Sequence, residues 1–121
     1  MRSGVEDVPE ECAVEFAMEM LGGRWKLAVL KQLVSGTHRF GELRHALQGV
    51  TPRMLTRQLR ELEADGLVTR TVYAEVPPRV EYALTEVGQS LESITDELDK
   101  WGRWYRETIR REAPFGLHPT A

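Results

Sequence analysis

The sequence has little of what several classes of protein require. Its 121 residues include only one cysteine, Cys12, so no intramolecular disulfide can form and nothing requires an oxidising compartment. Its apolar runs are far shorter than the ~20 residues that span a bilayer, and residues 1–7 do not show the pattern of a secretory leader. We therefore expect a cytoplasmic protein with no membrane partner.

Patterns for metal binding and catalysis are also missing. The three histidines, His38, His45 and His118, lack ligand spacing with one another or with Cys12, which predicts no metal site. The sequence contains no phosphate-binding loop, no dinucleotide fingerprint and no nucleophile–base pattern. We expect neither an enzyme nor a cofactor.

Charge is distributed unevenly along the chain, although its net value is −3. Residues 23–80 carry ten basic and five acidic side chains, whereas residues 1–22 carry one basic and six acidic, and residues 81–121 five basic and eight acidic. A basic centre between acidic ends is typical of a protein that binds a polyanion with its middle and uses its termini otherwise.

Apolar periodicity predicts the order of elements. The expected helices cover 11–21, 25–34, 40–47 and 52–65, the strands cover 67–73 and 79–83, and a long helix runs from Thr85 to about Arg111. Two helices joined by a tight Gly49 turn and followed by a β-ribbon predict a mainly α winged helix-turn-helix. This domain would cover 11–111, between a flexible N-terminal tail (1–10) and a C-terminal tail (112–121).

The fourth helix carries the most informative pattern. Thr51 suits the N-cap, Pro52 the first helical position and Gly66 the residue after the end. At about 100° per residue, three arginines share one side of this helix and three leucines the opposite side. These residues are Arg53, Arg57 and Arg60, and Leu55, Leu59 and Leu62. A solvated surface helix is the alternative, but the surrounding helix-turn-helix favours a helix that reads the major groove of DNA.

From Cys12 to about Trp104 the sequence resembles the HxlR-type winged-helix transcriptional regulators of bacteria. The resemblance is carried by Gly22-Gly23-Arg24-Trp25-Lys26 and by residues 39–43, 49–55, 59–68, 76–82 and 84–88. It implies a homodimeric, sequence-specific DNA-binding repressor or activator, with residues 51–60 in the major groove and 74–80 as the wing. One departure is Ala13, where the family often has proline after its N-terminal cysteine, and this weighs against a thiol-sensing role.

Contacts with double-stranded DNA are predicted mainly from the fourth helix. The predicted set is Thr51, Pro52, Arg53, Thr56, Arg57 and Arg60. Thr51, Arg53, Thr56 and Arg57 are candidates for base edges, and Arg60 for the phosphate backbone.

Three further basic residues are candidates for DNA contact outside that helix. Arg79 would act from the wing, unless it pairs with Glu75 or Glu81. Arg39 would touch phosphate, unless it is a solvated loop residue, and Lys26 would reach the backbone from the second helix.

Dimerisation is predicted at the terminal helices. Apolar residues of the last helix recur at spacings of four and three, as in a coiled-coil seam. They are Val87, Leu91, Ile94, Leu98, Trp101 and Tyr105, and the first helix adds Val14, Met18 and Leu21. Packing of this seam onto its own domain is the alternative.

Cys12 is the candidate redox or electrophile sensor, because a thiol at a helix N-terminus can be acidified. Three glutamates nearby in sequence oppose a thiolate, and a buried, small apolar role is the alternative.

The sequence therefore predicts a homodimeric transcriptional regulator, expected to be a repressor, on a palindromic operator. The main alternative is a winged-helix module that docks a protein partner. A further one is a regulator that binds a small apolar effector around Trp101 and Trp104.

Overall fold

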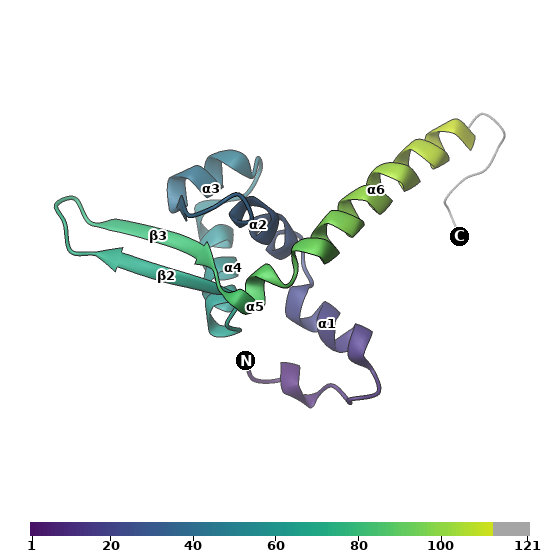
Figure 1. Cartoon of the computed structure of the whole chain (residues 1–121), viewed down its shortest axis with the longest axis horizontal. Coiled ribbons are helices and arrows are strands. Elements are labelled where there is room, and N and C mark those ends of the chain that lie inside the picture. The colour runs from purple at the N-terminus through teal and green to yellow at the C-terminus, as the bar shows by residue number, and fades with distance from the viewer. Residues whose placement is uncertain (113–121) are drawn as a thin grey trace.

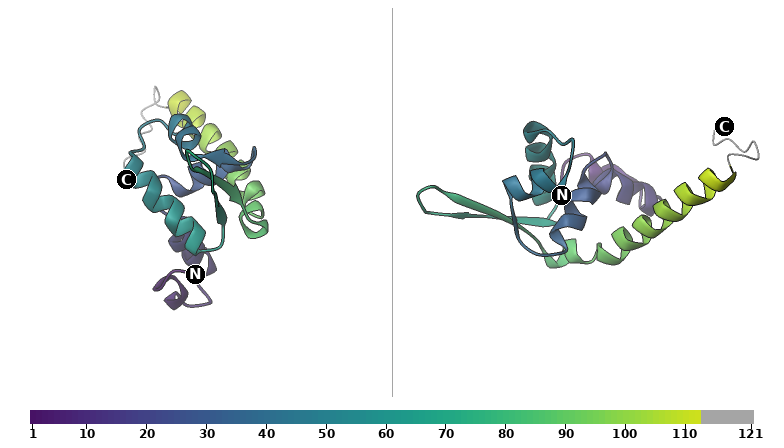
Figure 2. Two further views of the ribbon diagram at one scale, coloured as in Figure 1. Left: turned by 90° about the vertical axis from the view of Figure 1, so that its left-hand side faces the viewer. Right: turned by 90° about the horizontal axis from the view of Figure 1, so that it is seen from above.

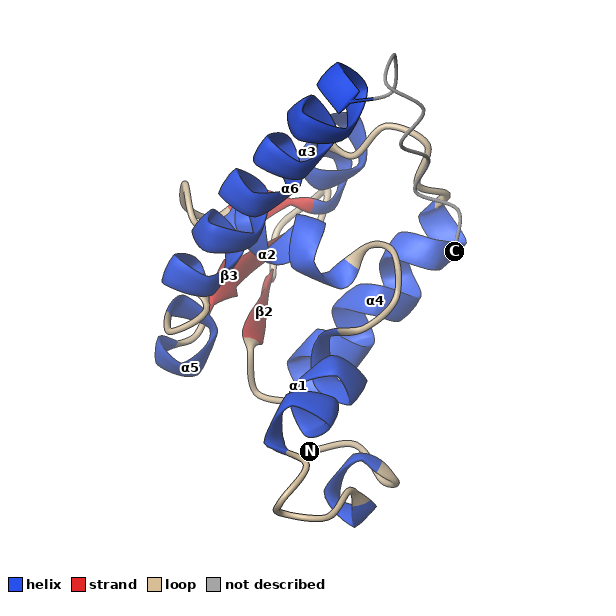
Figure 3. Ribbon diagram, turned by 90° about the vertical axis from the view of Figure 1, so that its right-hand side faces the viewer, coloured by secondary structure: helices blue, strands red, loops and turns tan. Residues whose placement is uncertain are grey.

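The computed structural model describes residues 1–112 of the chain. Helices make up most of this part, with one small sheet among them (Figure 3). The elements are η1 (Val5–Asp7), α1 (Ala13–Leu21), α2 (Lys26–Leu33), β1 (His38–Arg39), α3 (Phe40–Ala46), α4 (Pro52–Ala64), β2 (Val68–Tyr73), β3 (Arg79–Leu84), α5 (Glu86–Gln89) and α6 (Glu92–Glu112). The predicted mainly α winged helix-turn-helix is confirmed, with α3 and α4 as its helix pair.

Local signals fix the ends of α4. The Thr51 hydroxyl accepts a hydrogen bond from the Met54 N–H at 3.1 Å, and Pro52 occupies the first turn. Gly66 follows the helix with φ +76°, a left-handed conformation that glycine adopts without strain. The predicted boundaries of this helix are therefore confirmed to within one residue.

The core forms where α4 meets α2, α3 and the sheet. Leu55, Leu59 and Leu62 are all buried on the inner side of α4, where they join Leu30 and Leu43 of the neighbouring helices. Burial of each leucine contributes on the order of 2 kcal/mol. This packing fixes which side of α4 remains outside.

The sheet is antiparallel in the order β1-β3-β2. Strands β2 and β3 pair from Val68↔Leu84 to Tyr73↔Arg79, and residues 74–78 form the exposed tip. The hairpin, hereafter the wing, projects from one side of the domain, and α6 projects from the other (Figures 1 and 2). Strand β1 was not predicted, because its two residues carry no periodicity and exist as a strand only by pairing with β3.

The prediction of one continuous final helix is wrong. It is divided into α5 and α6 at Ser90 and Leu91. Buried Gly88 holds α5 against the sheet: a Cβ on it would lie 2.1 Å from the Leu67 carbonyl oxygen. Beyond this contact Leu91 packs on the core, and α6 then leaves the domain (Figure 1). Close packing of α5 thus fixes the place where the helix is interrupted.

The segment of residues 1–10, hereafter the N-terminal arm, lies against the domain rather than standing free as expected. It contains η1, whose Val5 is buried, and its Arg2 bonds the carboxylate of Asp65. Of the predicted C-terminal tail, Glu112 ends α6 and residues 113–121 lie outside the described part. Within residues 1–112, no helix is both long and apolar enough to cross a membrane.

Candidate nucleic-acid interface

The outer side of α4 presents the predicted arginines. Arg53, Arg57 and Arg60 are exposed, whereas the leucines of the same helix are buried on the opposite side. Together with Pro52 and Thr56 they line one shallow hollow on the surface of the helix. A helix of this kind fits into the major groove, and its guanidinium groups match the geometry of guanine edges and phosphates.

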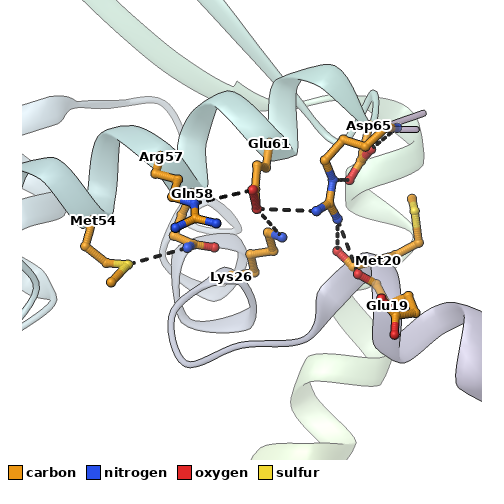
Figure 4. Close-up of polar contacts among 9 residues, drawn as sticks. Glu19, Met20, Lys26, Met54, Arg57, Gln58, Glu61 and Asp65 are labelled. Carbon is orange, nitrogen blue, oxygen red and sulfur yellow. Dashed lines mark hydrogen bonds and ion pairs between the residues drawn. The ribbon is translucent and has the colours of Figure 1, made fainter. Parts of the chain in front are cut away.

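Arg57 is held loosely by an acid of the same helix. Its Nε lies 3.7 Å from Glu61 Oε2, and its side chain is 74% exposed. Figure 4 shows Glu61 joined by dashed lines to both Arg57 and Lys26. Arg57 is therefore only weakly attracted to Glu61, one helical turn away, and its guanidinium remains accessible to a ligand.

Glu61 is the centre of a charge network. Its Oε1 lies 2.7 Å from Lys26 Nζ and 3.3 Å from Arg2 Nη1. The hydrogen bond from Lys26 lowers the pKa of Glu61, with help from the charges of Lys26, Arg2 and Arg57 and against the effect of burial. The carboxylate is thus ionised at neutral pH beside the candidate DNA-binding residues.

The structure does not favour the DNA contact predicted for Lys26. The residue is only 4% exposed, and its ammonium is engaged with Glu61 between α2 and α4. The sequence could not reveal this, because the burial of Lys26 depends on which side of α2 faces α4. Lys26 joins two helices instead of facing a phosphate.

Arg79 of the wing adopts the ion-paired alternative. Its guanidinium lies 3.2 Å from Glu75, 3.8 Å from Glu81 and 3.9 Å from the ring centroid of Tyr73. A DNA phosphate would therefore compete with these two acids for Arg79. Arg39 is exposed at the start of α3, where its backbone N–H donates to Glu42 at 2.8 Å.

Sequence reasoning missed Arg70. This exposed residue of β2 faces the hollow between α4 and the sheet, which Thr56, Arg60, Glu63 and Tyr82 also line. A basic residue in the strand that follows the arginine-bearing helix was the available signal. Arg70 extends the basic surface from α4 onto the wing.

The predicted dimer residues divide into two groups. Seven of them are exposed: Val14, Met18, Val87, Ile94, Leu98, Trp101 and Tyr105. Val14 is 81% exposed and Trp101 is 58% exposed and stacked on Tyr105, with the ring centroids 5.1 Å apart. Leu21 and Leu91 differ, because Leu21 is buried in the core of its own domain and Leu91 packs against that core. The exposed group leaves an apolar surface on α1 and α6.

Cys12 is the N-cap residue of α1 and is half-buried, with a free thiol. Its backbone N–H donates to the Pro9 carbonyl at 3.0 Å, and its carbonyl accepts from the Phe16 N–H at 2.8 Å. The residue therefore joins the N-terminal arm to α1.

Relatives of known class share both sequence and fold. The chain is 46% identical over 108 residues to the HTH-type transcriptional regulator YybR of Bacillus subtilis, covering 89% of this chain and 86% of that protein. It is 53% identical over 106 residues to an HTH-type transcriptional regulator of Methanothermobacter thermautotrophicus, covering 85% and 81%.

A solved structure of the redox regulator HypR in its reduced form is also similar. It matches with a TM-score of 0.77 and 46% identity, over 82% of this chain and 98% of that one. The HypR structure in its oxidised form matches with a TM-score of 0.73 and 50% identity, over 76% and 95%. The HxlR-like helix-turn-helix family model matches residues 20–110. With the capped α4, its exposed arginines and the wing, these matches show that the chain belongs to the HxlR-like helix-turn-helix family and is a DNA-binding transcriptional regulator.

Proposed function

We propose that the protein is a repressor that binds a palindromic operator as a homodimer, with α4 of each protomer in the major groove. The observation that carries the proposal is the exposure of Arg53, Arg57 and Arg60 opposite the buried leucines. Pro52 and Thr56 belong to the same surface, and we add Arg70 to it. Thr51 lines the neighbouring hollow, which it shares with Arg57. Because relatives come from bacteria and an archaeon, whose chromosomes lie in the cytoplasm, we place the action there.

Phosphate contacts would supply affinity and base contacts would supply discrimination. Residues at the start of α4 are the candidates for base edges, since a recognition helix contacts bases with its N-terminal residues. Arg60, a turn further along, is the candidate for the backbone. Arg39 and Arg79 are candidates only for peripheral contacts, the latter after release from Glu75.

The homodimer is proposed from the uncovered apolar surface of α1 and α6. A projecting helix with Leu98, Trp101 and Trp104 exposed has few apolar contacts with its own domain. Exposed apolar side chains at coiled-coil spacing, like those of α6, are typical of interaction sites. A two-fold axis through the terminal helices would also keep the acidic ends away from DNA and place two α4 helices about 34–36 Å apart, as one turn of B-DNA requires.

The test combines DNA binding with oligomeric state. Gel shifts with fragments of the genome of the source organism should detect a retarded complex, and footprinting should give a symmetric site. Sedimentation equilibrium should give a dimer, and Trp101→Glu should give a folded monomer with much weaker DNA binding. The proposed dimer is excluded if the wild type is a monomer both free in solution and in its complex with DNA. The lack of any retarded fragment would favour the protein-docking alternative.

A second role, control by thiol chemistry, is supported by the similarity to HypR in its oxidised and reduced forms and by the position of Cys12 between the arm and α1. Oxidant or electrophile should then change the footprint of the wild type and leave that of Cys12→Ser unchanged. Equal responses of both proteins would remove Cys12 from the proposal.

A further inference from the structure

The N-terminal arm reaches the helix that carries the candidate DNA-binding arginines. Arg2 Nε lies 2.7 Å from Asp65 Oδ2, and the Arg2 backbone N–H donates to Asp65 Oδ1 at 2.9 Å. The guanidinium also lies 3.3 Å from Glu61 and donates to the carbonyls of Glu19 and Met20 at the end of α1. One side chain therefore joins the ends of α1 and α4.

Arg2 compensates the acids at the C-terminal half of α4. The Asp65 side chain is 0% exposed, and Arg2 is 23% exposed, so the pair is shielded from solvent. The two oxygens of Glu61 are used differently: Oε1 is close to Lys26 and Arg2, whereas Oε2 lies 3.7 Å from Arg57, beyond hydrogen-bond distance. The division of contacts leaves Arg57 only weakly held.

We infer that the N-terminal arm supports the DNA-binding surface without itself contacting DNA: Arg2 neutralises Glu61 and Asp65 and thereby leaves Arg57 available to a DNA phosphate or base. Without Arg2, the Glu61 carboxylate has one cation fewer on Oε1 and attracts Arg57 more strongly. Arg2 is thus a positioning residue that acts through Glu61, and the inference rests on the proposed contact between Arg57 and DNA.

A double-mutant cycle between Arg2→Gln and Arg57→Ala tests the inference. The full chain carries any affinity tag after residue 121, and binding to a fixed duplex is measured by fluorescence anisotropy below the unfolding temperature of every variant. Because partly exposed ion pairs are weak, Arg2→Gln should raise the Kd about three- to tenfold. In the Arg57→Ala background the same substitution should change the Kd less than about twofold, since the residue through which Arg2 acts is gone.

Arg53→Ala is the matched control, because Arg53 lies on the same surface and Glu61 pairs with Arg57 instead. The fold-increases in Kd caused by Arg2→Gln and by Arg53→Ala should therefore multiply in the variant that carries both substitutions. The inference is overturned if Arg2→Gln leaves the Kd unchanged, or if its effect is as large without Arg57 as with it, which would indicate a direct contact between Arg2 and DNA. If Arg57→Ala alone does not weaken binding, the proposed role of Arg57 fails instead.

Discussion

Replacement of Arg60 with alanine should reduce the salt dependence of DNA binding by a calculable amount. The outer side of α4 exposes three arginines, so the proposed dimer would bring six to the DNA. Each neutralised phosphate releases counterions and contributes about 0.9 to the slope of log K against log salt. Arg60 is the arginine assigned to the phosphate backbone, so two of the six contact phosphate, and their loss should lower the magnitude of the slope by about 1.8.

Between 50 and 200 mM salt, the wild type should therefore lose about tenfold more affinity for DNA than Arg60→Ala loses. Fluorescence anisotropy titrations on one duplex at four or five salt concentrations measure both slopes. Lys100→Ala is the control, because this exposed lysine lies on α6, away from α4, and pairs with Glu97. An unchanged slope in Arg60→Ala, or wild-type affinity independent of salt, would refute the assignment of Arg60 to phosphate.

Three further outcomes are expected. Arg53→Ala should cost roughly 1–3 kcal/mol of binding and relax the preference at one position of each half-site, measured by binding selection on randomised duplexes; equal weakening on all sequences would make Arg53 a phosphate contact. Lys26→Ala should lower the free energy of unfolding by about 2 kcal/mol with an unchanged m-value in urea, because the partly buried Glu61 carboxylate loses its shortest ion-pair contact; no loss would contradict the assigned structural role. Hydrogen bonds from Lys31 and Arg103 lower the pKa of Asp99 to about 2. The stability that ionised Asp99 gives the folded protein is therefore complete above about pH 4 and is lost as the pH falls toward 2. The difference in Tm between wild type and Asp99→Asn should close over that range, and a constant difference would show that ionisation is not its cause.

Local rules explain why α4 was predictable. A hydroxyl at Thr51, a ring at Pro52 and a left-handed glycine at Gly66 act within a few residues of the helix ends, so their effect can be read without the fold. The alternation of arginines and leucines likewise determined which side would be buried. The principal candidate DNA-binding surface thus follows from the sequence.

Long-range contacts explain what was missed. Arg2 and Asp65 are 63 positions apart, and no local signal connects them. The interruption after Gly88 depends on the approach of α5 to Leu67, and the apolar spacing continues across it. The burial of Lys26 likewise required the packing of α2 on α4 to be known. In each case the deciding partner came from another element.

The interruption at Ser90 and Leu91 is a joint about which the whole of α6 can rotate relative to the domain. The 21 residues of α6 measure about 31 Å, so a rotation of 10° at this joint would displace the far end by about 5 Å. If α6 of one protomer packs against α6 of the other, the same rotation instead moves the two α4 helices along the DNA. The angle at two residues would then set the distance between half-sites, and substitutions there could retune operator spacing without altering any residue that touches a base.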